Sequence, residues 1–443
     1  MSVNVDIPRP TDRKSTQRER LIAGMIAATS GHGYAGATVS HVISHAGVSR
    51  PTFYEYFADK DDCFLAAHGE LARLLVWEVQ RTVDAVAPER AVQAAIRRFV
   101  ELSEEFPDRA VLLTNETMAG GRDALDAHDR MMDEMAAVVE GARARASART
   151  PTPDLPIQTV FGAGRWLLAP ALRRGERNLG ALADDLAHWV DSYMTPSAEH
   201  RWDRLDPVPS LLPSPHVAKL SLGPPPTIPP GRSRLSKGEI VRNQHDRIMY
   251  ATAKVAAEKG YSATTVADIT AGASVDRRVF YKHFRDKQQA FLAVHEFAVH
   301  QVLDLAASAF FSADSWPERV WEAMRATTQF ESSHPVMAHI GHVESHAVGA
   351  PAIQRIDDAR AAFRIFLQEG SQMVREPMSR TVLEAISGAV FEIGYHQARR
   401  GFSDRIYRLA PHATYIVLAP FMGPVAANEF VDEKLREAAA QSA

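Results

Sequence analysis

Apolar residues recur at helical spacing in three short stretches near the beginning of the chain. The first covers residues 21–26, the second follows an i, i+3, i+4, i+7 pattern over 39–46, and the third has Phe53 and Phe57 on one face. These periods predict three short amphipathic helices. Thr38, directly before the second stretch, is a favoured N-cap residue, so we expect that helix to begin there.

The same pattern occurs a second time along the chain. The segment Gln17–His68 aligns with Gln244–His295 at a constant offset of 227 without a gap, and 18 of the 52 positions are identical. Solenoid repeats are only roughly 20–50 residues long. The sequence therefore indicates duplication of a whole domain.

A proline-rich segment separates the two copies. Residues 196–235 contain 10 of the 26 prolines, and proline lacks a backbone donor and favours extended chain. We expect a semi-rigid linker there. The expected order is a flexible N-terminus (1–14), a first head (15–61) and body (62–195), the linker (196–235), and a second head (236–288) and body (289–443).

Each body consists of long stretches with helical periodicity. The first body has five, over 62–86, 89–105, 122–148, 157–174 and 178–194, and the second has five, over 288–311, 316–332, 351–374, 377–400 and 403–421. The fold class that follows is all-α, with two tandem units that each combine a three-helix head and a helical body.

Charge is distributed unevenly along the chain. The net charge of −4 combines +3 for residues 9–60 and +6 for 232–287 with −13 for the remainder. Basic heads suit a polyanion, and acidic bodies repel it. The apolar fraction of 46%, the single cysteine and the lack of a signal peptide or membrane span predict a soluble cytoplasmic protein.

The third helix of each head has the features of a DNA-recognition helix. A tight turn precedes it, and it begins after Ser49 in one copy and Asp276 in the other, both favoured N-caps. Because Phe53 and Phe57 point inward, the outer face carries Arg50 and several tyrosines. Two short helices joined by a tight turn form a helix-turn-helix.

These motifs resemble the tetracycline-repressor-like (TetR) family of transcriptional regulators. The resemblance is carried by G-Y-x-x-x-T-V at 33–39, A-G-V-S-R-P-T-F-Y-E-Y-F at 46–57 and D-K at 59–60, with a second copy over 260–287. It implies a three-helix DNA-binding head and a larger helical body for ligand binding and dimerisation in each half. Family members usually bring two heads together from two chains, whereas this chain carries both.

The resemblance places DNA-contacting residues in and around the third helix of each head. Arg50 and Arg277 are expected to read guanine by paired hydrogen bonds, and Thr52 and Val279 to touch a thymine methyl. Other polar residues of this helix, and those that begin the neighbouring helices, are expected at phosphates: Tyr54, Tyr56, Tyr281, His283, Thr38, Thr265, Lys60 and Lys287.

The two heads differ at the positions that would meet DNA. The first has Ser49-Arg50-Pro51-Thr52 where the second has Asp276-Arg277-Arg278-Val279, so we expect different half-sites. Ser274 also replaces the turn glycine Gly47, and a left-handed backbone there would cost a serine energy. Loss of DNA binding by one head is the alternative; the second is suspect for its turn, yet it is the more basic.

The last two helical stretches of each body also match. Thr159-Val160 precedes Arg173-Arg174-Gly175, and Thr381-Val382 precedes Arg399-Arg400-Gly401. In the family these helices form the dimer interface, so the halves are expected to pair as an intrachain pseudo-dimer on double-stranded DNA. Pairing of two chains into a homodimer stays open.

A pocket for a small, largely apolar effector is expected between the helices of the bodies. Its candidate lining residues are Met131, Phe161, Trp166, Phe363, Phe366, Phe391 and Tyr395. Ordinary core packing is the competing explanation for each of them.

No cofactor is expected, and the protein is interpreted as an effector-responsive repressor rather than an enzyme. The alternatives are an architectural or adaptor protein that binds DNA without an effector, and a metal-dependent helical enzyme. Only the run His339, His342 and His346, on one helical face, offers ligands for a metal such as Zn²⁺.

Overall fold

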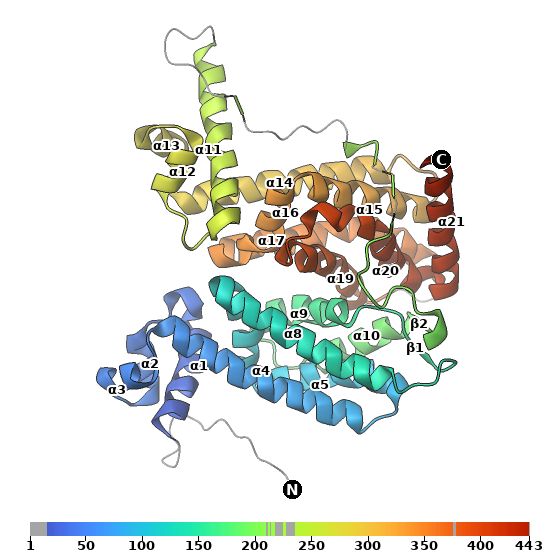
Figure 1. The fold of residues 1–443 in the computed structure, drawn as a ribbon, viewed down its shortest axis with the longest axis horizontal. Helices are drawn as coiled ribbons and strands as arrows, with labels where there is room; N and C mark the ends of the chain where they lie inside the picture. Colours follow the sequence, from blue (N-terminus) through green and yellow to red (C-terminus); the bar gives the residue numbers. More distant parts are fainter. Residues whose placement is uncertain are drawn as a thin grey trace. The chain divides into compact units, whose positions relative to one another are not determined.

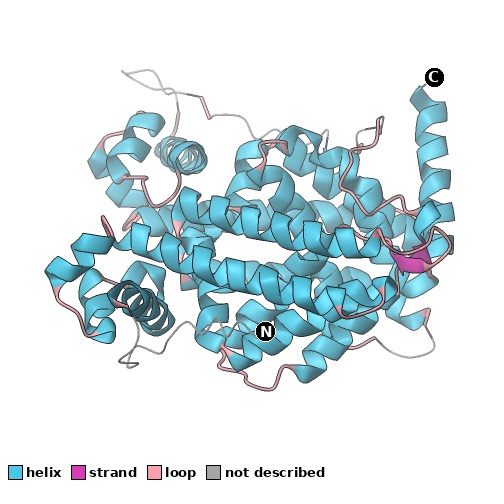
Figure 2. Cartoon of the chain, turned by 60° about the horizontal axis from the view of Figure 1, so that its bottom comes forward, coloured by secondary structure: helices cyan, strands magenta, loops and turns pink. Residues whose placement is uncertain are grey.

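The computed structural model describes residues 16–209, 211–212, 214–217, 225–226, 235–374 and 378–442. The chain divides into two compact units: unit 1 comprises residues 1–203 and 379–388, and unit 2 comprises residues 204–378 and 389–443. Both are helical, as Figures 1 and 2 show, and the predicted all-α class is confirmed. The N-terminus (1–14) that the sequence predicts to be flexible lies outside the described residues.

The head of unit 1 consists of α1 (Gln17–Gly36), α2 (Val39–Ala46) and α3 (Arg50–Tyr56). α1 begins with a capping box, because Thr16 accepts from the N–H of Glu19 and the Glu19 side chain accepts from that of Thr16. Phe53 and Phe57, on the inner face of α3 and at its end, are buried against α1 and α2 as the sequence predicts.

The body of unit 1 is built on α4, which continues directly from the head. It contains α4 (Lys60–Asp84), η1 (Pro88–Arg90), α5 (Ala91–Glu105), α6 (Pro107–Val111), the π-helical turn η2 (Leu112–Glu116), α7 (Thr117–Ala119), α8 (Gly121–Arg143), α9 (Ile157–Arg173) and α10 (Gly180–Asp191). Its two short antiparallel strands, β1 (Pro151–Pro153) and β2 (Met194–Pro196), pair Thr152 with Thr195.

The head of unit 2 repeats that of unit 1. It consists of α11 (Lys237–Lys259), α12 (Val266–Ala273) and α13 (Arg277–His283), and Phe280 and Phe284 take the places of Phe53 and Phe57 in its core. Ser236 and Glu239 form the same capping box at the start of α11. Equivalent local sequences therefore produce equivalent local structures.

The body of unit 2 has the same beginning and more irregular connections. It contains α14 (Lys287–Phe310), α15 (Trp316–Ser333), α16 (Pro335–His342), η5 (Glu344–Val348), α17 (Ala350–Phe363), α18 (Ile365–Gln368), η6 (Gly370–Gln372), α19 (Arg380–Arg399), η7 (Ser403–Leu409), α20 (Ala410–Met422) and α21 (Pro424–Ser442). Of the described helices, α14 alone is long and apolar enough to cross a membrane. Many of its apolar side chains pack in the core of unit 2 instead.

The described parts of the proline-rich segment are packed on the units. In unit 1, η3 (Ser197–Glu199) follows β2, and the Asp154 carboxylate accepts from the backbone of Trp202 at 2.8 Å. In unit 2, the N–H of Val208 donates to the Arg408 carbonyl at 3.2 Å, and Val217 joins a buried apolar cluster. Residues 210, 213, 218–224 and 227–234 lie outside the described ranges, and the domain boundaries stay predictions.

Candidate DNA interface

The turn between α2 and α3 has the geometry of a helix-turn-helix in both heads. Gly47 takes a left-handed conformation with φ of +61°, and its counterpart Ser274 takes the same conformation with φ of +48°. Ser274 is the one described non-glycine residue with positive φ. The left-handed backbone that the sequence analysis considers at this serine is therefore present, and that conformation is unfavourable for a residue other than glycine.

An arginine from the first helix holds this turn in each head. Arg20 donates to the Gly47 carbonyl at 2.7 Å, and Arg247 donates to the Ser274 carbonyl at 3.0 Å. Sequence reasoning missed this contact. The signal was present, because Arg20 and Arg247 are identical residues at the offset of 227.

The outer face of α3 is exposed and carries most of the predicted DNA-contacting residues. Arg50 is exposed and donates to the Ser40 hydroxyl at 2.8 Å. Tyr54 is 51% exposed and Tyr56 is 42% exposed. These side chains share a surface that contacts no other part of unit 1 closely enough to bury them.

Ser49, Pro51 and Thr52 belong to the first turn of α3. Ser49 is its N-cap, accepting from the N–H of Thr52 at 3.3 Å, and Pro51 occupies a position where a missing N–H costs nothing. The hydroxyls of Ser49 and Thr52 lie 2.8 Å apart and bond to each other. Polar atoms in this turn are thus already partnered within the head.

The recognition helix of unit 2 presents a more basic surface. Arg277 and Arg278 are both exposed, and Arg277 donates to the Tyr281 hydroxyl at 3.3 Å. Asp276 is the N-cap and accepts from the N–H of Arg278, whereas Val279 is half-buried and packs on the head core.

His283 lies at the end of this recognition helix. It is partly buried, and burial, aided by the nearby His245 and Lys282, lowers the pKa of its imidazole. His283 is therefore neutral over a wider pH range than an ordinary histidine, and offers one N–H donor.

Thr38 and Thr265 are N-caps of α2 and α12, as the sequence predicts. Thr38 accepts from the N–H of His41 at 3.3 Å, and Thr265 forms a capping box with Asp268. Both residues are exposed at a helix N-terminus, where unpaired N–H groups favour an anion.

Lys60 and Lys287 lie against the end of the first helix of each head. The Lys60 amine donates to the Tyr34 carbonyl at 3.0 Å and lies 4.1 Å from the centre of the Tyr34 ring. The Lys287 amine donates to the carbonyls of Tyr261, Ser262 and Thr264. These lysines stabilise the junction of head and body, and would have to give up those bonds to reach a phosphate.

A carboxylate from each body also holds its head, and sequence reasoning missed it. Glu116, at the end of η2, accepts from the N–H of Tyr34 at 2.5 Å, and Glu344, in η5, accepts from that of Tyr261 at 2.7 Å. The preceding glycines, Gly33 and Gly260, have positive φ. We call these two contacts the head–body latches. Burial raises the pKa of the Glu116 carboxyl.

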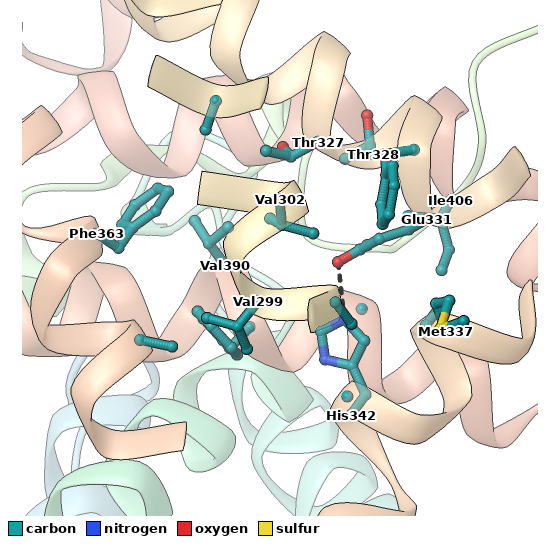
Figure 3. Close-up of a pocket in the computed structure, with 18 of the residues that line it drawn as sticks. Val299, Val302, Thr327, Thr328, Glu331, Met337, His342, Phe363, Val390 and Ile406 are labelled. Atoms are coloured by element: carbon teal, nitrogen blue, oxygen red, sulfur yellow. Dashed lines mark hydrogen bonds and ion pairs between the residues drawn. The ribbon is translucent and has the colours of Figure 1, made fainter. Parts of the chain in front are cut away.

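Unit 2 contains an apolar cavity of about 120 Å³. Val299 and Val302 from α14, Phe363 from α17 and Val390 from α19 form apolar walls, as Figure 3 shows. The main polar feature is a hydrogen bond of 2.9 Å between the carboxylate of Glu331 on α15 and Nε2 of His342 on α16.

The predicted effector residues fall into two groups. Phe363 and Phe391 line this cavity, but Phe366 and Tyr395 are buried and are absent from its lining. In unit 1, Met131 lines an open hollow of about 340 Å³ among charged side chains. Phe161 packs edge-on against Phe99, and Trp166 lies under the Arg165 guanidinium.

The three histidines that offered metal ligands have separate surroundings. His342 pairs with Glu331, His339 lies 3.3 Å from Glu344, and His346 is buried in η5. Among the described residues, no group of three or more histidine, cysteine, aspartate or glutamate side chains could hold a metal ion.

Two three-helix heads, each with an exposed third helix that begins with an arginine after a left-handed turn, define a helix-turn-helix protein. The family model for bacterial regulatory proteins of the tetR family matches residues 26–67 and 248–294, one segment in each head. The match therefore shows two copies of this family's DNA-binding segment in one chain.

Curated relatives match about a third of the chain. It is 22% identical to the HTH-type transcriptional regulator RutR of Escherichia coli K12 over 131 residues, 29% of this chain and 62% of that protein. It is 29% identical to the HTH-type transcriptional repressor AcnR of Corynebacterium diphtheriae over 147 residues, 33% of this chain and 74% of that protein.

Solved structures match about two fifths of the chain. A TetR family transcription regulator from Marinobacter aquaeolei VT8 is 22% identical with a TM-score of 0.33, and the match covers 39% of this chain and 96% of that one. The transcriptional regulator FadR from Bacillus subtilis, solved with stearoyl-CoA, is 14% identical with a TM-score of 0.34, covering 41% and 98%.

Proposed function

We propose that the chain is a cytoplasmic, effector-responsive transcriptional repressor that binds one imperfectly palindromic operator with two unequal heads. The observation that carries this proposal is the repeated recognition helix: Arg50 and Arg277 are both exposed at its first turn. Arginine there is suited to two parallel hydrogen bonds with guanine in the major groove. The relative named AcnR is a repressor, which favours repression over activation.

The surrounding residues divide into base contacts and backbone contacts. Thr52 and Val279 occupy the same position of the recognition helix and would touch a thymine methyl. Exposed polar groups, together with the partly buried His283, would fix each head on the phosphates: Thr38, Ser49, Tyr54, Tyr56, Thr265, Tyr281 and Arg278. Pro51 and Asp276 would shape the first turn, and their difference makes the half-sites unequal.

The two heads would act as an intrachain pseudo-dimer. Support comes from the matching sequences at 159–175 and 381–401, which lie in α9 and α19 and just beyond them. Residues 379–388, from the second half of the sequence, belong to unit 1. One chain would then supply both heads of an operator, whose half-sites lie about 34–36 Å apart in the simplest geometry.

The effector would act through the bodies. Each head is tied to its own body by a latch, Glu116 in unit 1 and Glu344 in unit 2. A ligand that shifts the segment bearing the latch changes the position of the head. For a hundredfold loss of operator affinity, the effector needs to bind the released conformation only about 2.7 kcal/mol more tightly than the DNA-bound conformation.

Selection of bound sequences from random duplex DNA tests this proposal. The full chain is compared with Arg50→Ala and Arg277→Ala, and exposed arginines away from the heads, Arg81→Ala and Arg436→Ala, serve as matched controls. We expect a bipartite, asymmetric motif in which each head variant relaxes one half-site. Loss of one bidentate contact should weaken binding by about 1–3 kcal/mol, or about 5- to 150-fold.

A perfect palindrome altered by only one of the two variants would contradict the pseudo-dimer. It would mean that two chains supply one active head each. A motif shifted equally by the control variants would remove the assignment of Arg50 and Arg277 to base recognition.

A further inference from the structure

The cavity of unit 2 has the size of a single small ring. Its volume of about 120 Å³ is close to that of an apolar protein cavity of about 150 Å³ that holds one benzene molecule. The walls come from seven elements, and apolar side chains dominate them: Val299, Val302, Met337, Phe363, Val390 and Ile406 are drawn in Figure 3. A ligand of this size would lose most of its contact with water on entering.

Few polar atoms in the cavity are free to bind a ligand. The hydroxyls of Thr327 and Thr328 donate back to carbonyls of their own helix, at 2.9 and 2.6 Å. His295, in contrast, is 1% exposed, lines the cavity, and has no hydrogen-bond partner for its Nδ1. A buried polar atom without a partner is costly, so a ligand that satisfies it gains free energy.

Charge in the cavity selects against anions. Glu331, His342 and His295 are its ionisable residues, and no lysine or arginine lines it. Burial lowers the pKa of His295 to about 4, so this histidine is neutral at pH 7. A carboxylate ligand would therefore lie near the like-charged carboxylate of Glu331. His342 could not compensate for this repulsion, because it already bonds to Glu331.

We propose that this cavity binds a small uncharged molecule of one ring that carries a single hydrogen-bond donor, the chemistry of a phenol. The ring fills the space between α14, α17 and α19, and its hydroxyl donates to Glu331 or to Nδ1 of His295. That such a ligand regulates DNA binding rests on the function proposed above; the binding itself does not.

The position of the polar pair links the cavity to the head of unit 2. His342 ends α16, and Glu344, two residues later, holds the N–H of Tyr261 through the latch. His342 is tightly placed, because a Cβ on Gly394 would lie 2.3 Å from its Nε2. A ligand hydroxyl that competes for Glu331 displaces the His342 imidazole. Because this imidazole has no room to move toward α19, its displacement shifts the following residues of the chain, including Glu344.

Calorimetric titration of the full chain in the absence of DNA tests the binding. The probes are phenol, toluene, which lacks the donor, and benzoate, which is anionic. We expect saturable binding of phenol, with toluene and benzoate each at least tenfold weaker. Saturable benzoate binding as tight as that of phenol, or no binding of phenol, would overturn the proposal.

Two variants locate the ligand. Val302→Phe fills the cavity and should weaken phenol binding at least tenfold, whereas the matched substitution Val425→Phe, at a residue that is 64% exposed, should leave it unchanged. Glu331→Gln removes the negative charge of the cavity and should reduce the ratio of the affinity for phenol to the affinity for benzoate. Thermal unfolding of each variant checks that it folds, and undiminished phenol binding by folded Val302→Phe refutes this location.

Operator binding measured with and without phenol separates the two proposals. Release of DNA by phenol, lost in Val302→Phe, supports both. Phenol binding in the cavity without any change in DNA affinity upholds the ligand class and counts against an effector role for unit 2.

Discussion

Ser274 illustrates at the scale of one residue how the two heads have diverged without losing their fold. Its backbone is left-handed, as at Gly47, and its carbonyl still accepts from Arg247. An L-residue pays roughly 1–2 kcal/mol for that conformation, which glycine adopts freely. The turn geometry is thus retained at an energetic cost.

Ser274→Gly should therefore stabilise unit 2. We expect a gain of about 1 kcal/mol in the free energy of unfolding, partly offset by the greater entropy of an unfolded glycine. Urea denaturation measures it. Ala271→Gly, an exposed helical position in α12, is a control that should lose stability; a loss for Ser274→Gly as well would contradict the strain argument.

His68 and His295 are equivalent buried residues of the two bodies and predict a pH dependence of stability. Burial lowers both pKa values to about 4 from 6.5. Because the folded pKa is lower, the unfolded chain binds more protons between pH 4 and 6.5. Stability is complete above pH 6.5 and is lost as pH falls toward 4, by at most about 3 kcal/mol per histidine.

His68→Leu and His295→Leu isolate these contributions. Each should flatten the fall of the urea midpoint between pH 7 and pH 5 relative to the unmodified chain. His188→Leu, at an exposed residue of α10, is the control and should leave the slope unchanged. An unaltered slope in both buried-site variants would assign the acid sensitivity to other groups.

The sequence correctly predicts whether a residue lies on the buried or the exposed face of its helix where local periodicity decides this. The burial of Phe53 and the exposure of Arg50 follow from helical spacing and agree with the structure. The partners of exposed residues were not predictable: Ser40 for Arg50 and Tyr281 for Arg277 depend on side-chain conformation. Glu116 and Glu344 were missed because their contacts span 82 and 83 residues of sequence.

At the scale of elements, the end of α1 is where head and body meet. Gly33 has φ of +68°, and a Cβ there would lie 3.4 Å from Oε2 of Glu116. The glycine lets the chain turn so that the next N–H, that of Tyr34, points at the carboxylate. The same arrangement at Gly260 and Glu344 makes the latch a shared feature of both units.

Gly33→Ala should weaken this junction, whereas Gly31→Ala should not. Gly31 lies within α1, and a Cβ there would meet nothing within 4 Å. Because alanine favours a helix more than glycine does, that variant is expected to be neutral or slightly stabilising. Gly33→Ala should lose about 1–3 kcal/mol, because its φ of +68° and ψ of 163° lie in a region that glycine adopts almost exclusively. Hydrogen exchange at the head of unit 1 provides the measurement, and equal protection in the two variants would argue against the latch.

Elements with a regular apolar period were predicted well, whereas irregular ones were not. The stretches 39–46, 157–174 and 316–332 correspond closely to α2, α9 and α15. The stretch 351–374 is broken at Arg364 into α17, α18 and η6. The sequence analysis assigns no helical stretch to α16 and η5, which carry both the cavity wall and a latch, and their histidines suggested a metal site instead.

At the scale of the whole molecule, the decisive quantity is the number of chains on one operator. The pseudo-dimer predicts one chain per two-half-site duplex, measured by sedimentation or native mass spectrometry with the selected DNA. A duplex with a single half-site is the control and should bind the same single chain far more weakly. Two chains per operator, each using one head, would contradict the prediction.

The covalent joining of two unequal heads changes how occupancy depends on copy number. A regulator assembled from separate chains loses a head whenever dilution splits it, so its operator occupancy falls steeply at low abundance. In the proposed pseudo-dimer the second head arrives with the first, at an effective concentration fixed by the chain and independent of how many copies the cell holds. That pseudo-dimer would also not exchange partners with related regulators, so a single gene would specify the pair of half-sites that the two heads read together.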